Sequence, residues 1–443
     1  MIPLSEDSNG INSVLPKMIR LILFSAAVLF SFLVPSSAQA PKKGKPIPVT
    51  GHANPDVASF DDMMLSFMAK QNVPGAALAV TRDGMLVYAR GFGMADQMGP
   101  VAPRALFRIA SISKPITAAA IMKLIQEGKL KLDDRAFAIL KLQPLLPKGR
   151  KRDPRLKDIT IRELLHHTGG WDRDKSFDPM FRSVEIAQAF KSPPPAHPDQ
   201  IIRYMLGRPL DFTPGERYAY SNFGYCVLGR IIEKISGESY EEYVKKHILA
   251  PLGIQTTRLG KTLPKGRAGL EVSYHDEKNR TGPSVFAANL GKQVPLPYGA
   301  WCLEAMDSHG GWISSAVDLV RFASAFDKPE QCKILTKKSI ETMFARPQGA
   351  AGHDAKEKPR AAYYACGWNV RTVGKDKADQ WHTGALDGTA TILVRRHDGL
   401  CWAVLFNTRS NPQGKDLIGL IDGQVHAAAD KVERWPRRPV PIK

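Results

Sequence analysis

Cysteine is scarce in this 443-residue sequence, and several common binding motifs are missing from it. The five cysteines include no Cys-x-x-Cys pair, so their spacing does not indicate a zinc or dithiol redox site, and an odd number leaves at least one thiol unpaired. The sequence has no phosphate-cradling Gly-x-x-x-x-Gly-Lys-Ser/Thr loop, no zinc-finger spacing and no RNP-like aromatic motif. We therefore expect no metal, no cofactor and no nucleic-acid partner.

Acidic residues are also scarce relative to basic ones. The chain has 62 Lys and Arg against 43 Asp and Glu, which gives a formal net charge of +19. Basic residues cluster at 41–45 and in PKGRKRDPRLK at 147–157. A field of this sign attracts anionic partners. With nucleic acid set aside, an anionic cell-envelope surface is the candidate partner, and the alternative is a solvated basic surface with no dedicated partner.

The N-terminal apolar run, Leu21–Val34, is too short to span a bilayer comfortably. It follows Lys17 and Arg20 and is itself followed by small residues that end in Ala-Gln-Ala at 38–40. This pattern is typical of a secretory signal that is cleaved after its last alanine. The sequence therefore predicts a secreted or periplasmic protein, and an uncleaved membrane anchor is the alternative.

Strand-like patterns lie near both ends of the chain, with helical patterns between them. AALAVTRDGMLVYARGFG at 76–93 predicts a hairpin that turns at Asp83-Gly84. ATILVRR at 390–396 and CWAVLFN at 401–407 predict a second hairpin. From about 130 to 300 the chain is mainly helical and rich in loops. We expect one sheet built from both ends of the chain, with a helical insertion in the middle.

These patterns also predict where the segments begin and end. In chain order, the expected segments are a signal peptide (1–40), a linker (41–52), one folded domain (53–425) and a basic C-terminal tail (426–443). Within the domain, the sheet is expected from 53–130 and 305–425, and the helical insertion is expected at 131–304.

Three short motifs occur in order along the chain: Ser111-Ile-Ser-Lys114 at the start of a helix, Tyr220-Ser-Asn222, and His382-Thr-Gly384 beside a strand. Each is common by chance, and His-Thr-Gly occurs a second time at 167–169. That other copy follows a capped helix and leads into irregular sequence, so we interpret His167 as a structural histidine. Only the copy beside a strand can lay backbone groups along the edge of an active site.

The residue types in these motifs fit nucleophilic catalysis. Serine and lysine three residues apart share a helix face, so the amine of Lys114 can reach the hydroxyl of Ser111. Burial near the positive end of the helix dipole lowers a lysine pKa, and a neutral amine can act as a general base for serine. Tyr220 can relay the proton to the leaving group, and Asn222 can hold the lysine and a substrate amide. The backbone N–H groups of Ser111 and Ala385 can form an oxyanion hole.

Longer stretches around the motifs carry a resemblance to a known family. The sequence resembles the serine β-lactamase-like family, which includes class C β-lactamases, DD-carboxypeptidases, esterases and D-aminopeptidases. The matching stretches are FRIASISK (107–114), LKLDD (130–134), ITIRELLHHTGG (159–170), FTPGERYAYSNFGYCVLG (212–229), APLGIQTT (250–257), GGWISSAVDLVRF (310–322) and HTGALDG (382–388). The resemblance implies an α/β (α+β) fold in which an antiparallel sheet is flanked by helices, with an all-helical subdomain.

The resemblance also implies roles for the motif residues. It makes Ser111 the nucleophile, with Lys114 and Tyr220 as the acid/base pair. The implied positioning and substrate-binding residues are Asn222, His382, Thr383 and Gly384.

One residue departs from the pattern of the class C β-lactamases. They carry a lysine where this sequence has His382, whereas several DD-peptidases and D-aminopeptidases of the family carry histidine. A histidine of ordinary pKa is mostly neutral at pH 7, so we expect poor β-lactamase action. We also expect carboxylate-bearing substrates to be favoured as the pH falls towards about 6, where imidazolium forms. Arg395 or Arg396 is a candidate for the missing charge.

Taken together, these features predict an exported serine hydrolase that forms an acyl-enzyme on Ser111 and acts on a small-molecule or cell-wall peptide substrate. It is expected to resemble a DD-carboxypeptidase or an esterase, because a fold and a triad do not fix the substrate. The alternatives are a class C-type β-lactamase, a penicillin-binding sensor or scaffold with little turnover, and a basic envelope-binding protein with a vestigial site. The sequence does not determine the oligomeric state.

Overall fold

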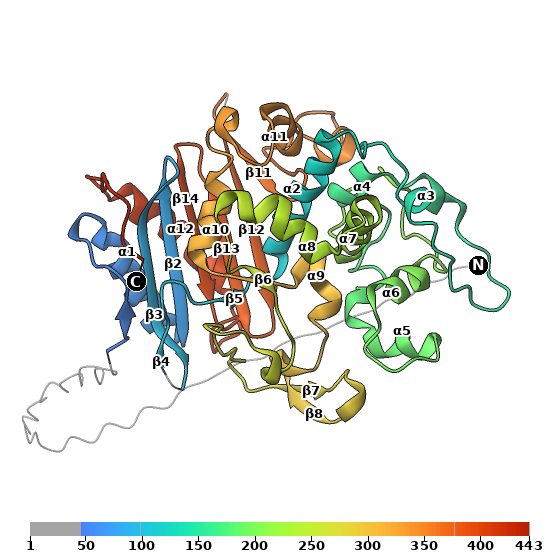
Figure 1. Cartoon of the computed structure of the whole chain (residues 1–443), viewed down its shortest axis with the longest axis horizontal. Helices are drawn as coiled ribbons and strands as arrows, with labels where there is room; N and C mark the ends of the chain where they lie inside the picture. The colour runs from blue at the N-terminus through green and yellow to red at the C-terminus, as the bar shows by residue number, and fades with distance from the viewer. Residues whose placement is uncertain (1–45, 98, 376, 443) are drawn as a thin grey trace, which may run out of the picture. The chain divides into compact units, whose positions relative to one another are not determined.

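A nine-stranded antiparallel sheet forms the frame of the computed structural model, which describes residues 46–97, 99–375 and 377–442 (Figure 1). Its strands are β1 (Val49–Thr50), β2 (Gly75–Arg82), β3 (Met85–Asp96), β4 (Gly99–Pro100), β10 (Ala362–Tyr364), β11 (Asn369–Val373), β12 (Lys377–Leu386), β13 (Thr389–Arg395) and β14 (Leu400–Phe406). The main order is β1-β3-β2-β14-β13-β12-β11-β10, with β4 paired to β3. Strands from the two ends of the chain meet where β2 pairs with β14, which confirms the predicted antiparallel sheet.

Four helices cover the two faces of the sheet: α1 (Ala58–Gln71) and α12 (Leu417–Asp430) on one, and α2 (Ser113–Gln126) and α10 (Ala316–Ser324) on the other (Figure 1). The side chains of β14 point alternately into two hydrophobic cores, one on each face of the sheet. Trp402 and Phe406 face the core beneath α1 and α12, whereas Ala403 and Leu405 face the core shared with α2 and α10. Successive side chains on a strand point to opposite faces, so a strand covered on both sides reads as a continuous apolar run.

The middle of the chain forms the predicted helical region beside the sheet (Figure 1). Its helices are α3 (Ala136–Leu140), α4 (Ile161–Leu165), α5 (Ser183–Ala189), α6 (Pro198–Met205), α7 (Asn222–Ser236) and α8 (Tyr240–Val244), and α9 (Asp307–Gly310) and α11 (Lys337–Phe344) follow. The central helix α7 contacts α2, α3, α4, α6, α8 and α9. Helix α7 therefore connects the helical region to α2.

Short strands also occur outside the main sheet. Strand β9 (Trp312–Ser314) pairs with β5 (Phe107–Arg108) and β6 (Arg258–Leu259), and β7 (Thr281–Pro283) pairs with β8 (Gln293–Pro295). Three of them, β6, β7 and β8, lie inside the stretch expected to be helical, so the insertion at 131–304 is not purely helical. Two-residue and three-residue pairings leave no periodicity that a sequence pattern can report.

The two ends of the folded unit differ from the expected boundaries. The predicted signal peptide, 1–40, lies outside the described residues. The linker expected at 41–52 already contains β1, which pairs with β3. The predicted tail at 426–443 is wrong for its described part, because α12 continues to Asp430 and the buried Val440 donates its backbone N–H to Leu86. The buried side chain of Val440 and its backbone hydrogen bond hold the end of this basic segment against β3.

All five cysteines are unpaired, and four of them are buried. Burial raises the pKa of both Cys302 and Cys366 to about 12. Within the residues described, no helix is long and apolar enough to cross a membrane. The same residues contain no group of three or more His, Cys, Asp or Glu side chains placed to hold a metal ion.

Candidate active site

Ser111 lies in a tight 3-10 turn, Ala110–Ile112, that connects β5 to α2. The regular helix therefore begins two residues after the serine and not at it. Ala110 has a φ of 47°, in the left-handed region that residues with a side chain seldom adopt. Such strain persists only where surrounding contacts enforce it, and it is common at functional sites.

Hydrogen bonds from β13 and close contact with β12 hold this turn in place. Thr391 Oγ1 donates to the carbonyl oxygen of Ile109 at 3.0 Å. A Cβ atom at Gly384 of β12 would lie 2.2 Å from the same carbonyl oxygen and 3.1 Å from the backbone nitrogen of Ser111. Real Cβ atoms do not approach so closely, so the absent side chain of Gly384 lets the strand lie against the serine turn. This is the physical reason for glycine in the third motif.

Lys114 connects two of the motifs from a completely buried position. Its Nζ lies 3.1 Å from Ser111 Oγ, 2.8 Å from Asn222 Oδ1 and 3.0 Å from the carbonyl oxygen of His309. Burial lowers the pKa of Lys114 well below 10.5 and outweighs the opposing charge of Asp178. A neutral amine has two N–H groups and one lone pair, and the two carbonyl oxygens can only accept. The lone pair is therefore left for the hydroxyl hydrogen of Ser111.

Asn222, at the start of α7, is oriented by a residue that the motifs did not reveal. Because Asn222 Oδ1 accepts from Lys114, its Nδ2 is free to donate, and it does so to Asp178 Oδ2 at 2.6 Å. The other carboxylate oxygen of Asp178 accepts the backbone N–H of Met180 at 3.1 Å. The only sequence signal for Asp178 is its position before a proline at a helical start, which marks a cap and not an active site.

Tyr220 is stacked among charged and aromatic groups beside the lysine. Lys114 Nζ lies 4.7 Å from the centre of the Tyr220 ring, and the guanidinium of Arg173 lies 4.8 Å from it. Burial raises the pKa of Tyr220 above its ordinary value of 10.0, although a hydrogen bond with Ser111 acts in the opposite direction. Tyr220 is therefore a neutral phenol at rest, and it can donate a proton but cannot serve as the resting base.

His382 is buried, with only 2% of its surface exposed, and its ring is held by two hydrogen bonds. Its Nδ1 lies 2.7 Å from the carbonyl oxygen of Thr383, so Nδ1 carries the hydrogen. Its Nε2 then accepts a hydrogen bond from the hydroxyl of Tyr364 at 2.9 Å. Burial lowers the pKa of His382 to about 3. The expectation that His382 becomes charged near pH 6 is therefore wrong, because burial of the ring, which the motif does not reveal, disfavours the imidazolium form.

His167, from the other His-Thr-Gly copy, also lies next to the site but not in the cleft. Its ring centre lies 4.4 Å from that of Tyr220 and 4.4 Å from that of Tyr364. Its Nδ1 accepts the backbone N–H of Ser221 at 3.2 Å. Burial lowers its pKa well below 6.5. These contacts agree with a structural role, in which the neutral ring supports Tyr220 from behind.

A cleft of about 360 Å³ opens above Ser111. Its lining includes Ser111, Asn222, Ala385, Arg173, Asp387 and Arg409, whereas the exposed side chain of Thr383 is not part of it. The cleft therefore contains charges of both signs, and Arg409 lies 3.6 Å from Asp387.

The two arginines suggested by the sequence do not reach this cleft. Arg395 pairs with Asp327 at 2.8 Å, and Arg396 pairs with Asp398 and Asp430, each at 2.7 Å. The prediction that one of them supplies the missing charge is therefore wrong. Strand alternation indicates that neighbouring residues face opposite sides, but it does not identify their partners.

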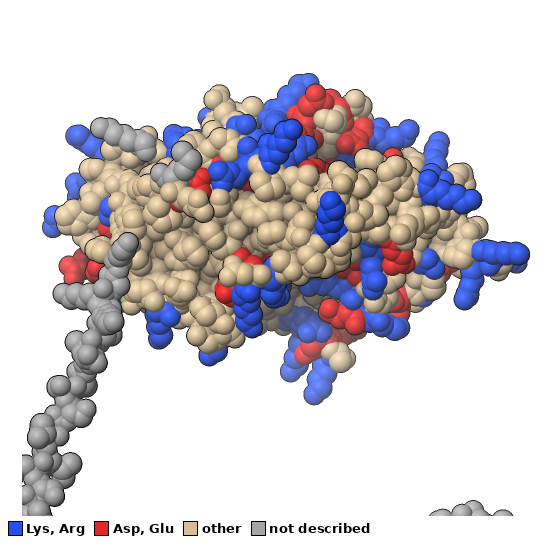
Figure 2. Space-filling model, turned by 90° about the horizontal axis from the view of Figure 1, so that it is seen from below, with Lys and Arg blue, Asp and Glu red and all other residues tan. Residues whose placement is uncertain are grey.

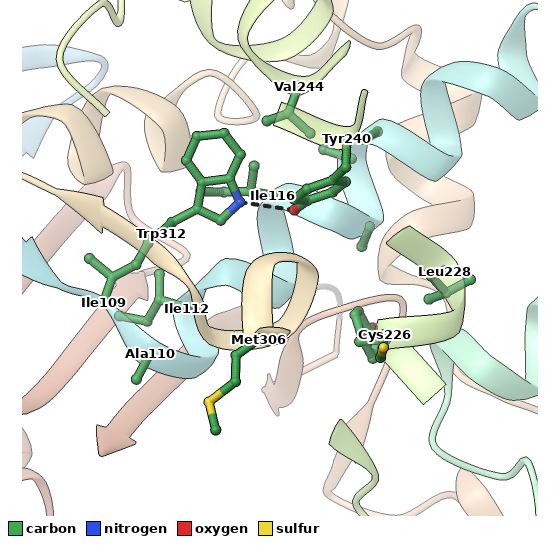
Figure 3. Packing of buried hydrophobic residues seen from close by; sticks show 14 of the residues in the cluster. Ile109, Ala110, Ile112, Ile116, Cys226, Leu228, Tyr240, Val244, Met306 and Trp312 are labelled. Carbon is green, nitrogen blue, oxygen red and sulfur yellow. Dashed lines mark hydrogen bonds between the residues drawn. The ribbon is translucent and has the colours of Figure 1, made fainter. Parts of the chain in front are cut away.

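The serine turn rests on a packed layer between α2 and the helical region. Trp312 Nε1 donates to Tyr240 at 2.9 Å, as the dashed line in Figure 3 shows, and Ile109, Ile112 and Ile116 lie around this pair. All five side chains are buried. Close packing of this kind limits the movement of the Ser111 turn.

Most of the chain matches a known protein family. The family model described as Beta-lactamase matches residues 60–425. Among curated proteins, the chain is 25% identical over 343 residues to protein flp of Staphylococcus aureus strain MW2, which covers 77% of this chain and 61% of that protein. It is 26% identical over 296 residues to a putative D-alanyl-D-alanine carboxypeptidase of Escherichia coli K12, which covers 61% of this chain and 66% of that protein. The chain thus spans somewhat less than two thirds of each relative.

Solved structures agree with the fold. A penicillin-binding protein homologue from Pyrococcus abyssi, described as octameric, aligns with a TM-score of 0.59 at 26% identity over 83% of this chain and 77% of that chain. The D-amino acid amidase of Ochrobactrum anthropi SV3 aligns with a TM-score of 0.62 at 21% identity over 85% and 98% of the two chains. EstCE1, described as a hydrolase with promiscuous acyltransferase activity, aligns with a TM-score of 0.62 at 19% identity over 84% and 98%.

Proposed function

Because the chain belongs to the β-lactamase family, we propose that it is a serine hydrolase that transfers an acyl group through Ser111. The observation that carries this proposal is the environment of Lys114, whose buried amine has two carbonyl acceptors and one serine hydroxyl as its neighbours. This arrangement supplies an activated nucleophile at neutral pH.

The proposed reaction has two steps. The amine of Lys114 takes the hydroxyl proton of Ser111 while the serine oxygen bonds to the substrate carbonyl carbon, and the backbone N–H groups of Ser111 and Ala385 stabilise the oxyanion. The phenol of Tyr220 then gives its proton to the leaving group, is reprotonated from the Lys114 ammonium, and the acyl-enzyme remains. Water repeats the sequence as nucleophile, so the acid leaves and Ser111 regains its proton.

We propose esters and amides without a carboxylate next to the scissile bond as the substrate class. The support comes from His382, which occupies the position that is lysine in class C β-lactamases but is neutral, buried and bonded to Tyr364. A neutral imidazole facing a tyrosine gives little attraction to a substrate carboxylate. The same argument makes efficient β-lactam hydrolysis a poor match to this site.

A DD-carboxypeptidase is the second candidate. The Escherichia coli relative carries that name, and two cations, Arg173 and Arg409, line the cleft. Arg173 is half-exposed and its nearest carboxylate oxygen, on Asp174, is 3.9 Å away, so its charge is available to a substrate carboxylate. Under this alternative the arginines take the place of the missing lysine.

We also propose that the protein is secreted or periplasmic, with an anionic envelope surface as a partner. The support is the pattern of basic, apolar and small residues at 17–40 and the formal net charge of +19.

Four substrates, tested in parallel, distinguish the candidates: a p-nitrophenyl ester, a D-amino acid anilide, a peptide ending in D-Ala-D-Ala and a fluorescent penicillin. The proposal expects the highest kcat/KM with the ester or anilide, and a loss of at least about 10³-fold in Ser111→Ala. Highest turnover of the D-Ala-D-Ala peptide would favour the second candidate. Stable penicillin labelling with no turnover of any substrate would instead indicate a sensor, and undiminished hydrolysis by Ser111→Ala would end the proposal.

A further inference from the structure

A second cavity lies on the helical region, away from the residues of the active-site cleft. It has a volume of about 570 Å³ and lies between the loop at 147–155 and the segment 207–209 that follows α6. Its lining contains five cationic side chains and a single carboxylate: Arg150, Lys151, Arg152, Arg155, Arg208 and Asp153. No residue is common to the two cavities. Part of the basic stretch at 147–157, which the sequence singled out, therefore forms the wall of a pocket.

The walls of this pocket are fixed by one carboxylate. Asp153 accepts both the Nε and the Nη2 of Arg155, at 3.0 and 2.7 Å, and also the backbone N–H of Leu210 at 3.0 Å. A further backbone hydrogen bond joins Leu145 to the carbonyl oxygen of Arg203, at 2.8 Å. These bonds tie the loop to the end of α6, so the pocket exists before any ligand arrives.

Three of the cations in the wall have no carboxylate of their own. Among the residues described, Arg155 is paired with Asp153, whereas Arg150, Lys151 and Arg152 form no ion pair. The Nε of Arg152 is buried and, within the described part of the chain, has no hydrogen-bond partner. A buried N–H without a partner is costly, so it marks a donor that a ligand can satisfy.

Arg208 adds a fourth available charge in a fixed position. Its guanidinium lies 4.3 Å from the centre of the Tyr204 ring and also contacts the hydroxyl of that tyrosine. Figure 2 shows Lys and Arg side chains projecting from the right-hand end of the view, the end formed by the helical region. The pocket thus combines a basic surface with a few N–H donors that are held in fixed positions.

We propose that this pocket binds phosphate groups. A phosphate carries up to two charges and three acceptor oxygens, and guanidinium groups bind it through paired N–H donors. The volume exceeds that of one phosphate, so the ligand carries a second phosphate or an attached polyol. In the cell such a ligand comes either from the headgroups of an anionic lipid surface or from a soluble polyphosphorylated compound, and in the first case the pocket holds the enzyme on the envelope. Binding here does not require the proposed hydrolysis at Ser111.

The first test is calorimetric titration of the full chain with inorganic tripolyphosphate at low salt. The variant Arg150→Gln/Lys151→Gln/Arg152→Gln removes three charges from the pocket, and the control Lys234→Gln/Lys338→Gln/Lys358→Gln removes three from exposed positions elsewhere. We expect one site per chain, at least about a tenfold weaker affinity in the pocket variant, and less than about a twofold change in the control. Equal losses in both variants would show diffuse attraction and overturn the proposal.

Vesicles distinguish the two sources of phosphate. Sedimentation with phosphatidylcholine vesicles, with and without phosphatidylglycerol, should show binding only to the anionic ones, and the pocket variant should lose it, if lipid headgroups are the ligand. Binding of tripolyphosphate alone would identify a soluble ligand. If the wild type binds neither probe, the proposal is wrong.

Folding and activity controls keep these outcomes separate from the proposed function. The thermal midpoint of each variant is measured, and the double variant Arg150→Gln/Lys151→Gln, with both positions exposed, repeats the test without changing Arg152. Ester hydrolysis should be unchanged in all pocket variants, because none of these residues lines the active-site cleft.

Discussion

The tripeptide His-Thr-Gly occurs at 167–169 and again at 382–384, and the two copies have different surroundings. Both histidines are almost fully buried, and burial lowers the pKa of each. The surroundings of the two glycines differ more than those of the two histidines. A Cβ at Gly384 would meet the carbonyl oxygen of Ile109 at 2.2 Å, whereas a Cβ at Gly169 would meet a carbon of the Trp171 ring at 2.8 Å. The second copy contacts the backbone beside Ser111, and the first contacts the side chain of Trp171.

The shared histidine does not distinguish the copy that lies beside Ser111 from the other copy. His167 lies in a loop with a φ of 59°, and His382 lies in β12, yet both contact Tyr364. What differs is the path of the backbone. Only the β12 copy runs next to the Ser111 turn, so only there would strand N–H groups face a carbonyl group bound at Ser111.

The largest expected effect comes from adding one methyl group to each glycine. Gly384→Ala should lower kcat/KM by about 100-fold or more, because the backbone at Ile109 cannot yield and the serine turn must shift. Gly169→Ala should keep activity within about fivefold, because the added methyl group would meet a side chain and not the backbone beside Ser111. Steady-state kinetics on one ester measures both, with thermal midpoints as the folding control. Equal losses of activity in the two variants would contradict the proposed difference between the two glycines.

A smaller effect is expected at the tyrosine between the two histidines. Tyr364→Phe keeps the ring against His167 but removes the hydrogen bond to Nε2 of His382. A buried acceptor left without its donor costs about 1–3 kcal/mol, and urea unfolding should show a loss of this size. An unchanged free energy of unfolding would mean that Tyr364 does not hold His382.

The pH dependence of stability should be affected in the same way by both histidines. The unfolded chain binds a proton on each histidine near pH 6.5, whereas the folded chain keeps His382 neutral down to about 3 and His167 neutral well below 6.5. Stability contributed by these groups is therefore fully present above about pH 6.5 and falls as the pH drops.

The slope approaches about 1.4 kcal/mol per pH unit where a histidine is protonated in the unfolded chain and neutral in the folded chain. Unfolding measured from pH 7 to pH 4.5 should show a shallower slope in His382→Gln and in His167→Gln than in the wild type. A slope that neither substitution changes would contradict the assigned neutral state of both rings.

Local patterns were sufficient for much of the fold. The hairpin at Asp83-Gly84 was predictable, and both residues have positive φ, at 51° and 82°. The strand pair β13–β14 was predictable from two apolar runs and the turn between them. Segments that depend on contacts with distant parts of the chain were not predictable. One is the C-terminal stretch, where Trp435 lies against Phe60 with ring centres 6.3 Å apart.

In the candidate site, too, local patterns identified some residues and missed those that depend on distant contacts. The motifs identified Ser111, Lys114 and Asn222, and the structure brings these three side chains together. They did not identify Asp178 or Tyr364, because each is the partner of a motif residue from a different part of the chain. The motif therefore placed His382 correctly on the strand, but its charge depends on burial, which spacing does not reveal.

The most direct test of the central claim is to observe the acyl group on the protein. The wild type is mixed with a p-nitrophenyl ester, quenched in acid during turnover, digested and analysed by mass spectrometry. The account predicts one acyl group on the peptide that contains Ser111, none in Ser111→Ala, and formation at least about 10³-fold slower in Lys114→Ala. An acyl group on any other residue, or equally fast acylation without the lysine amine, would contradict it.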